Sequence, residues 1–139
     1  MALLQRGVAV VTNRMPKVLS PRGHAIADYA TIGMFALMTA VFWKRNRRAA
    51  ISALLSGLAE TGTVLLTNFP GGVVRVIDFP THGKIDMGLG AATFTMPNLL
   101  GFDDEPEAKF FRMMGLNVTA VTGLTDFEGK QPELRRRAA

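Results

Sequence analysis

The stretch 25–43, AIADYATIGMFALMTAVFW, decides the fold that we predict for this chain. Only Asp28, Tyr29 and two threonines interrupt its nineteen residues. A helix rises about 1.5 Å per residue, so this stretch spans nearly all of a hydrocarbon layer about 30 Å thick. It ends at Trp43, just before the basic cluster 44–48. An aromatic residue followed by cations is typical of the lipid headgroup boundary, so we expect a transmembrane helix over 25–43.

Three more apolar stretches follow, which makes an all-α fold: an integral membrane bundle of four helices. Glu60 is the one ionisable residue of the second stretch, and Pro97 is expected to kink the third or end it early. Arg112 and Asn117 interrupt the fourth. These three helices are predicted at about 49–66, 83–102 and 108–124.

The chain also resembles itself at an offset of 58 residues, and no gap is needed to align the two halves. Identical pairs at this offset include His24 and His82, Asp28 and Asp86, Gly57 and Gly115, Thr67 and Thr125, and Phe69 and Phe127. We interpret the chain as a tandem duplication of a two-helix unit, with repeats at 17–71 and 75–129. Outside the repeats, we expect an interfacial N-terminal helix over 1–16 and a solvated basic tail over 130–139.

Each repeat crosses the membrane twice, so the two repeats are expected to be parallel, related by a pseudo-two-fold axis along the membrane normal. Both helix–helix loops then lie at one end of the bundle. Most of the sixteen Lys and Arg residues lie at the other end, which favours cytoplasmic termini, although the cluster 44–48 favours the reverse. Pairing of opposite charges across the loops is predicted between Lys44, Arg45, Arg47 and Arg48 and the acidic Asp103, Asp104, Glu105 and Glu107.

A His-x-x-x-Asp pair occurs once in each repeat, as His24 with Asp28 and His82 with Asp86. The spacing of four residues puts both side chains on one helix face. If the two pairs converge, they offer nitrogen and oxygen ligands for a divalent metal, a proton relay, or two histidine ligands for haem. The simpler interpretation is that each aspartate accepts a hydrogen bond from its own histidine, or from Lys17 or Arg75.

Glu60 is the second candidate for a functional residue, because an ionised carboxylate inside a membrane costs roughly 2.5 to 3.5 kcal/mol on insertion scales. Its counterpart in the other repeat is Val118, so the duplication did not require a carboxylate. Either Glu60 is a proton or cation site, or it is protonated or bonded to Tyr29, Thr61, Asn117 or Thr119. Small residues that permit close helix packing are Gly57, Gly62, Gly88, Gly90 and Gly115.

Several function classes are disfavoured by composition. The chain has no cysteine, which excludes disulfides and thiolate metal sites. Its net charge of +5 comes from cations at the ends of apolar stretches, without the basic helix face of a nucleic-acid-binding protein. No nucleophile with a base partner and no phosphate-binding glycine loop is present, so we expect no enzymatic activity.

One stretch resembles a known family. The run Met96-Pro97-Asn98-Leu99-Leu100-Gly101-Phe102, which follows Asp86 and two glycines, resembles the SPW-repeat family of small bacterial membrane proteins. That family has two-helix repeats with a Ser-Pro-Trp signature before a Gly-Phe end. Here Met96 and Asn98 stand where Ser and Trp would be, and the first repeat lacks the motif. The resemblance implies a small protein of four helices in a bacterial inner membrane and transfers no site.

Two functions are compatible with these features. The first is a structural or accessory subunit that binds the lipid bilayer and associates with other membrane subunits or with itself. The alternative is a small transporter or a metal-binding or haem-binding membrane protein that uses Glu60 and the two His-x-x-x-Asp pairs. A soluble four-helix bundle is a third possibility. The cofactor and the oligomeric state are not determined by the sequence.

Overall fold

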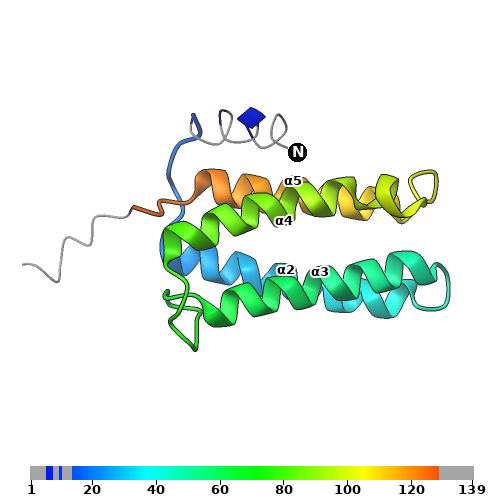
Figure 1. Ribbon diagram of the computed structural model, residues 1–139, viewed down its shortest axis with the longest axis horizontal. Helices are drawn as coiled ribbons and strands as arrows, with labels where there is room; N and C mark the ends of the chain where they lie inside the picture. Colours follow the sequence, from blue (N-terminus) through cyan, green and yellow to red (C-terminus); the bar gives the residue numbers. More distant parts are fainter. Residues whose placement is uncertain (1–5, 8–9, 11–13, 129–139) are drawn as a thin grey trace, which may run out of the picture.

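The computed structural model describes residues 6–7, 10 and 14–128, and this part of the chain is all-helical (Figure 1). The predicted segments 1–16 and 130–139 lie largely or entirely outside the described residues. Four long helices are present, and no strand is found among the residues described. They are α2 Pro21–Phe42, α3 Arg47–Leu66, α4 Phe79–Leu100 and α5 Ala108–Leu124. The prediction of four helices is confirmed, although three of them begin before the predicted residue.

The early starts of the helices have a local cause in capping. At the start of α2, the side chain of Ser20 accepts a hydrogen bond from the amide of Gly23 at 3.2 Å. Asp78 caps α4 in the same way and accepts from the amide of Thr81 at 2.8 Å. These hydrogen bonds from the Thr81 amide and hydroxyl also lower the pKa of Asp78. Each of these helices has a proline in its first turn, where the missing amide donor costs nothing.

The expectation is that Pro97 kinks the third helix or ends it early, and the end of α4 contradicts the second alternative. The helix continues to Leu100 and stops at Gly101, whose φ of 66° lies in the left-handed region that glycine adopts readily. The amide of Phe102 donates to the carbonyl oxygen of Pro97 at 2.9 Å. The stop is therefore set by the glycine and its capping bond rather than by the proline.

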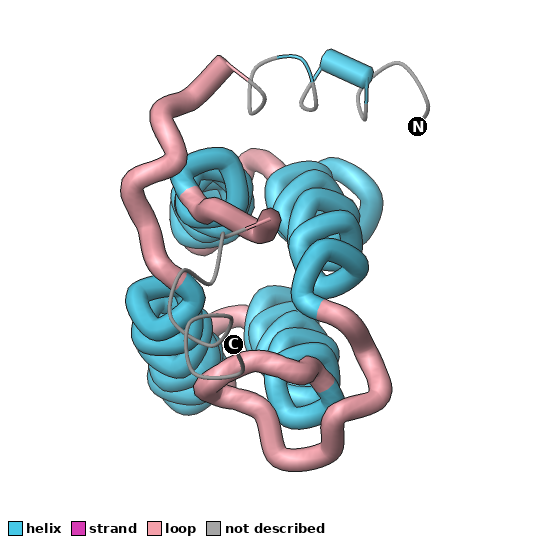
Figure 2. The backbone as a smooth tube through the Cα atoms, turned by 90° about the vertical axis from the view of Figure 1, so that its left-hand side faces the viewer, coloured by secondary structure: helices cyan, strands magenta, loops and turns pink. Residues whose placement is uncertain are grey.

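The helices form two antiparallel pairs, α2 with α3 and α4 with α5, which pack side by side (Figure 1). Seen from the end, the four helices surround a common interior (Figure 2). The loops that close the two pairs lie at one end of the bundle, which we call the loop end. The start of α2, the end of α5 and the connection from α3 to α4 lie at the opposite end, which we call the site end (Figure 1).

At the site end, the two helix pairs exchange backbone hydrogen bonds. The amide of Leu19 donates to Leu124 at 2.9 Å, and the amide of Ile77 donates to Leu66 at 2.9 Å. The two bonds are equivalent in the 58-residue offset, because Ile77 corresponds to Leu19 and Leu124 corresponds to Leu66. The segment before the first helix of each pair therefore bonds to the last helix of the other pair, and this arrangement ties the pairs together.

The packing between helices depends on small residues, though on fewer of them than predicted. A Cβ atom on Gly115 would lie 2.6 Å from the carbonyl oxygen of Gly90, so α4 and α5 are in close backbone contact there. At Gly57 a Cβ would lie 3.0 Å from the Cβ of Phe35. Gly62 and Gly88 have open space around them, so the prediction that these two serve helix packing is wrong.

The loop end combines an aromatic core with sparse charge pairing. Its buried side chains include Phe35, Phe42, Phe102, Phe110 and Phe111. Across the two loops, Nε of Arg45 forms an ion pair with Oε1 of Glu107 at 3.7 Å. The other predicted cations form no ion pair with the acidic loop: the guanidinium of Arg48 donates to the carbonyl oxygen of Gly101, and that of Arg47 lies over the ring of Trp43. The prediction of a broad charge network is therefore wrong for all but one pair.

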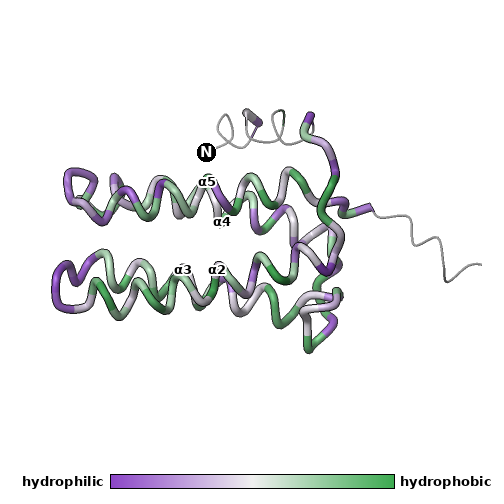
Figure 3. Tube along the Cα trace, turned by 180° about the vertical axis from the view of Figure 1, so that it is seen from behind, coloured by the Kyte–Doolittle hydropathy of each residue, from purple (hydrophilic) through white to green (hydrophobic). Residues whose placement is uncertain are grey.

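Strongly hydrophilic residues concentrate at the loops, and hydrophobic residues are spread along the helices (Figure 3). Helices α2 and α3 are long and apolar enough to cross a membrane. Only 28% of the apolar stretch of α2 is buried inside the protein, so most of this stretch is at least partly exposed on the outside of the bundle. Helix α5 has 17 residues and is shorter than these two.

Candidate metal centre

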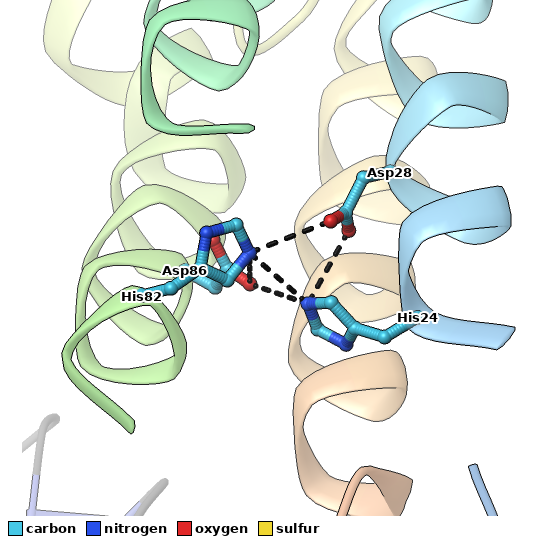
Figure 4. Close-up of side chains that lie close together, drawn as sticks. All are labelled: His24, Asp28, His82 and Asp86. Atoms are coloured by element: carbon cyan, nitrogen blue, oxygen red, sulfur yellow. Dashed lines mark hydrogen bonds and ion pairs between the residues drawn. The ribbon is translucent and has the colours of Figure 1, made fainter. Parts of the chain in front are cut away.

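Four side chains converge in the interior near the site end: His24 and Asp28 from α2, and His82 and Asp86 from α4 (Figure 4). Both histidines are fully buried, and both aspartates are nearly so. One ligand atom from each residue can be chosen so that all four lie within 4.8 Å of one another. The sequence predicts both pairs but leaves their convergence open, and the structure brings them together.

The distances inside this cluster are short and nearly uniform. The two Nε2 atoms lie 3.1 Å apart, and Asp86 Oδ2 lies 3.1 Å from Nε2 of His24 and 3.0 Å from Nε2 of His82. Asp28 presents one oxygen to each imidazole, at 3.4 Å in both cases. Each aspartate therefore contacts both histidines. The simpler interpretation, in which each aspartate contacts its own histidine, therefore describes half of these contacts, and the other half cross between the repeats.

The other nitrogen of His24 shows where its proton lies. Its Nδ1 atom is 2.7 Å from the hydroxyl of Thr125. That hydroxyl donates its own proton to the carbonyl oxygen of Val121 at 2.7 Å, so it accepts from the imidazole. In the neutral ring the proton is then on Nδ1, and the lone pair of Nε2 points into the cluster.

His82 is held in the same way by Thr67, which lies 58 positions before Thr125. Its Nδ1 atom is 2.8 Å from the Thr67 hydroxyl, which donates to the carbonyl oxygen of Thr63 at 2.6 Å. A hydrogen bond that fixes the second nitrogen of an imidazole is the usual support of a metal-binding histidine. The sequence also offers Lys17 as a hydrogen-bond donor to the aspartates. In the structure its ammonium group donates to the carbonyl oxygen of Gly123.

As a result, the cluster needs a positive charge at its centre. The two Nε2 atoms lie 3.1 Å apart, and two carboxylates add negative charge in a buried place, so the positive charge has to come from protons on the imidazoles or from a bound cation. Within the described part of the chain, Oδ2 of Asp28 and Oδ1 of Asp86 have no hydrogen-bond partner. Buried polar atoms without partners are rare and costly. A cation bound between the four residues removes both problems.

Three phenylalanines cover the cluster at the site end. The ring of His24 lies 5.3 Å from the ring of Phe79 and 5.2 Å from that of Phe127, centroid to centroid. Phe69 lies 5.2 Å from the ring of His82 and 5.3 Å from Phe79. This apolar cover limits the access of solvent to the cluster and lowers the local dielectric constant, which strengthens the attraction between the carboxylates and a cation.

Glu60 lies apart from the four ligands. Its side chain on α3 is buried, with 3% exposure, and no residue in the described ranges forms a hydrogen bond with its carboxyl group. Asp86, Asp28 and His82 are the ionisable groups whose charge bears on it. Its predicted hydrogen-bond partners are wrong: the three hydroxyls bond to backbone carbonyl oxygens, and the amide is exposed. These partners are Tyr29, Thr61, Thr119 and Asn117.

Sequence reasoning missed the residues that support the cluster. Thr67 and Thr125, and Phe69 and Phe127, are identical pairs of the 58-residue offset, but we assigned no role to them from the sequence. The signal that could have revealed them is that these identities belong to the same offset as the histidines. Phe79 has no identical counterpart, and nothing in the sequence marked it.

Comparison with known proteins yields no relative. No protein-family model, no curated protein and no solved structure matches this chain.

Proposed function

We propose that this protein is a small integral membrane protein that binds one divalent transition-metal ion through His24, Asp28, His82 and Asp86. The observation that carries the proposal is the convergence of two imidazole lone pairs and two carboxylates in one buried cluster. Ligands at 2.0 to 2.1 Å from a tetrahedral metal lie about 3.3 to 3.4 Å from each other. The contacts between the imidazoles and the carboxylates, at 3.0 to 3.4 Å, lie near that spacing, within a set whose four ligand atoms span up to 4.8 Å.

The ligand set indicates the kind of ion. Two neutral imidazoles and two carboxylates suit zinc, iron(II), cobalt(II) or manganese(II), whereas magnesium and calcium prefer oxygen alone. Two aspartates neutralise a divalent charge, so the occupied cluster is neutral in the low-dielectric interior. Haem is a poorer candidate, because a macrocycle between the imidazoles would have to replace the carboxylates that contact both rings.

The tandem duplication supports the proposal. Each predicted repeat supplies one histidine, one aspartate, one threonine bonded to an Nδ1 atom, and one phenylalanine of the equivalent pair Phe69 and Phe127. Residues 58 positions apart form equivalent contacts both in the cluster and in the backbone bonds at the site end. A site that lies between two copies of one unit is what a pseudo-two-fold axis produces.

Membrane insertion is supported by the apolar outer surface. Exposed aliphatic side chains on α2 and α3 include Ile26, Leu37, Leu55 and Leu58, each more than half exposed. Such a surface is stable against lipid and costly in water. Bacterial inner-membrane location and cytoplasmic termini remain predictions of the sequence. The accessory-subunit function also remains a prediction of the sequence. We favour metal binding over it because an accessory function gives no reason for the four buried histidine and aspartate side chains.

The test is the metal content of the purified full-length protein. The protein is extracted from membranes with mild detergent, and bound metals are counted by plasma mass spectrometry. We expect one transition-metal ion per chain. After exchange with cobalt(II), the intense visible bands of tetrahedral cobalt should appear.

The variants His24→Ala and Asp86→Asn should lose the ion, and Asp104→Asn, an exposed loop residue, should keep it. The variant Asp86→Asn preserves the shape of the side chain, so its loss of metal reports on ligation rather than on folding. A wild-type protein that takes up no metal would refute the proposed function. Recovery in the aqueous fraction without detergent would refute the membrane location.

A further inference from the structure

A line of buried polar side chains runs along α3, away from the metal cluster. Its members lie three or four residues apart and therefore share one helix face. All are at most 9% exposed. We call these residues the polar stripe: Ser52, Ser56, Glu60, Thr63 and Thr67.

The other repeat lacks this stripe. At the equivalent positions, α5 carries Phe110, Met114, Val118, Val121 and Thr125. Only the threonine that supports a histidine is shared. Packing of this fold is therefore satisfied by apolar residues at the other four positions. Because buried polar groups are costly in an apolar interior, the stripe needs an explanation other than packing.

The stripe connects two distinct places in the protein. At its site end, Thr67 holds the imidazole of His82. In its middle, Ser56 lies against α4, with its hydroxyl 3.9 Å from the sulfur of Met96. At its other end, the hydroxyl of Ser52 bonds to the backbone of Arg48, a residue exposed at the loop end. The stripe therefore extends from the metal cluster to the far surface.

Glu60 is the one ionisable residue of the stripe and lies at its midpoint. Its carboxyl group is buried and lacks a hydrogen-bond partner in the described ranges, while the four hydroxyls of the stripe each bond to a protein atom. The ionisable groups whose charge bears on it are Asp86 and Asp28 first and then His82, all from the cluster. A buried carboxyl group inside a membrane is the usual carrier of protons or cations.

We propose that the polar stripe is a proton path between the loop end and the metal cluster, with Glu60 as the carrier. The inference rests on the membrane location in the proposed function. A proton binds to a carboxylate oxygen of Glu60, forming an O–H bond that breaks when the proton leaves toward the other side. No electron is transferred. The hydroxyls, which can both donate and accept, lie on the same helix face on either side of Glu60 and are the groups that would pass the proton toward the two ends.

The experiment measures proton entry into vesicles that contain the purified full-length protein. A pH-sensitive dye is trapped inside, and a potassium gradient with valinomycin supplies the driving potential. The path is tested with Glu60→Val, which installs the residue of the other repeat, and with Glu60→Gln, which keeps the shape. The matched control is Glu105→Gln, an exposed acid in the loop between α4 and α5. Metal stoichiometry is measured on each preparation.

We expect the wild type and Glu105→Gln to acidify the vesicles faster than protein-free vesicles do. Both Glu60 variants should fall to the protein-free rate while retaining one metal ion per chain. Wild-type vesicles without added proton entry would overturn the proton path but leave the metal site standing. If both Glu60 variants lose the metal, Glu60 belongs to the metal site and the path is refuted. Absence of metal from the wild type refutes the proposed function independently of the flux.

Discussion

Replacement of Thr125 by valine tests the reasoning about the metal site most directly, because it changes no ligand. Thr125 is fully buried and makes two hydrogen bonds through one hydroxyl. It accepts from Nδ1 of His24 at 2.7 Å and donates to the carbonyl oxygen of Val121 at 2.7 Å. Valine has nearly the same shape but lacks the hydroxyl, so the variant leaves a buried imidazole N–H without an acceptor.

The expected magnitude follows from that orphaned donor. An unsatisfied buried polar group costs about 1 to 3 kcal/mol, and the metal-bound form bears this cost because a metal on Nε2 keeps the proton on Nδ1, whereas in the metal-free ring the proton can move to Nε2 beside Asp86. Since about 1.4 kcal/mol corresponds to a factor of ten in an equilibrium constant, metal affinity should fall by about 5-fold to 150-fold. This range agrees with the roughly 10-fold to 100-fold loss that is typical when the hydrogen-bond support of a metal ligand is removed.

Affinity is measured by competition with a chromogenic chelator in detergent. The matched control is Thr122→Val on the same helix: Thr122 is also buried, and its hydroxyl donates to the carbonyl oxygen of Val118 at 2.9 Å without contact to a histidine. We expect Thr125→Val to weaken binding within the stated range, Thr67→Val to do the same through His82, and Thr122→Val to leave it unchanged. Unaltered affinity in Thr125→Val, or equal losses in Thr125→Val and Thr122→Val, would refute the reasoning.

Two further predictions concern the bundle itself. Gly115→Ala should destabilise the fold by about 1 to 3 kcal/mol, because its Cβ would lie 2.6 Å from the backbone of Gly90. Gly62→Ala, in open space, should not destabilise it. Thermal unfolding followed by circular dichroism compares the two variants, and equal melting temperatures would contradict the close contact. The lowered pKa of Asp78, caused by its hydrogen bonds with Thr81, means that its stabilisation is present above the ordinary carboxyl pKa and is lost as pH falls through the lower folded value. In Asp78→Asn that part of the acid-induced drop in melting temperature should be missing, and an identical pH profile would count against it.

The number and type of the helices could be read from local information. An apolar run such as 25–43 is long enough to span a membrane wherever it occurs. The motif Asn68-Phe69-Pro70-Gly71-Gly72 ends a helix and favours a turn whatever surrounds it. The boundaries were less accurate because capping was overlooked. Ser20 and Asp78 each start a helix one turn before the hydropathy suggests, through a single side-chain hydrogen bond.

The candidate site was predicted only in part. Helical periodicity puts His24 beside Asp28, and the 58-residue offset marks a second such pair, but neither shows whether the pairs meet. Their meeting depends on how one helix pair packs against the other. It could not be derived from residue spacing within either repeat.

What the sequence determined by itself were the apolar stretches, the turns between them and the recurrence of motifs, because each depends on neighbours within a few turns of helix. Only the tertiary structure decided that the two imidazoles meet at their Nε2 atoms, that Thr67 and Thr125 orient them, and that Glu60 lies buried without a hydrogen-bond partner among the described residues. Those facts depend on the rotation and depth at which four helices pack. Many residues from distant parts of the chain set that packing together, so no single stretch of sequence contains it.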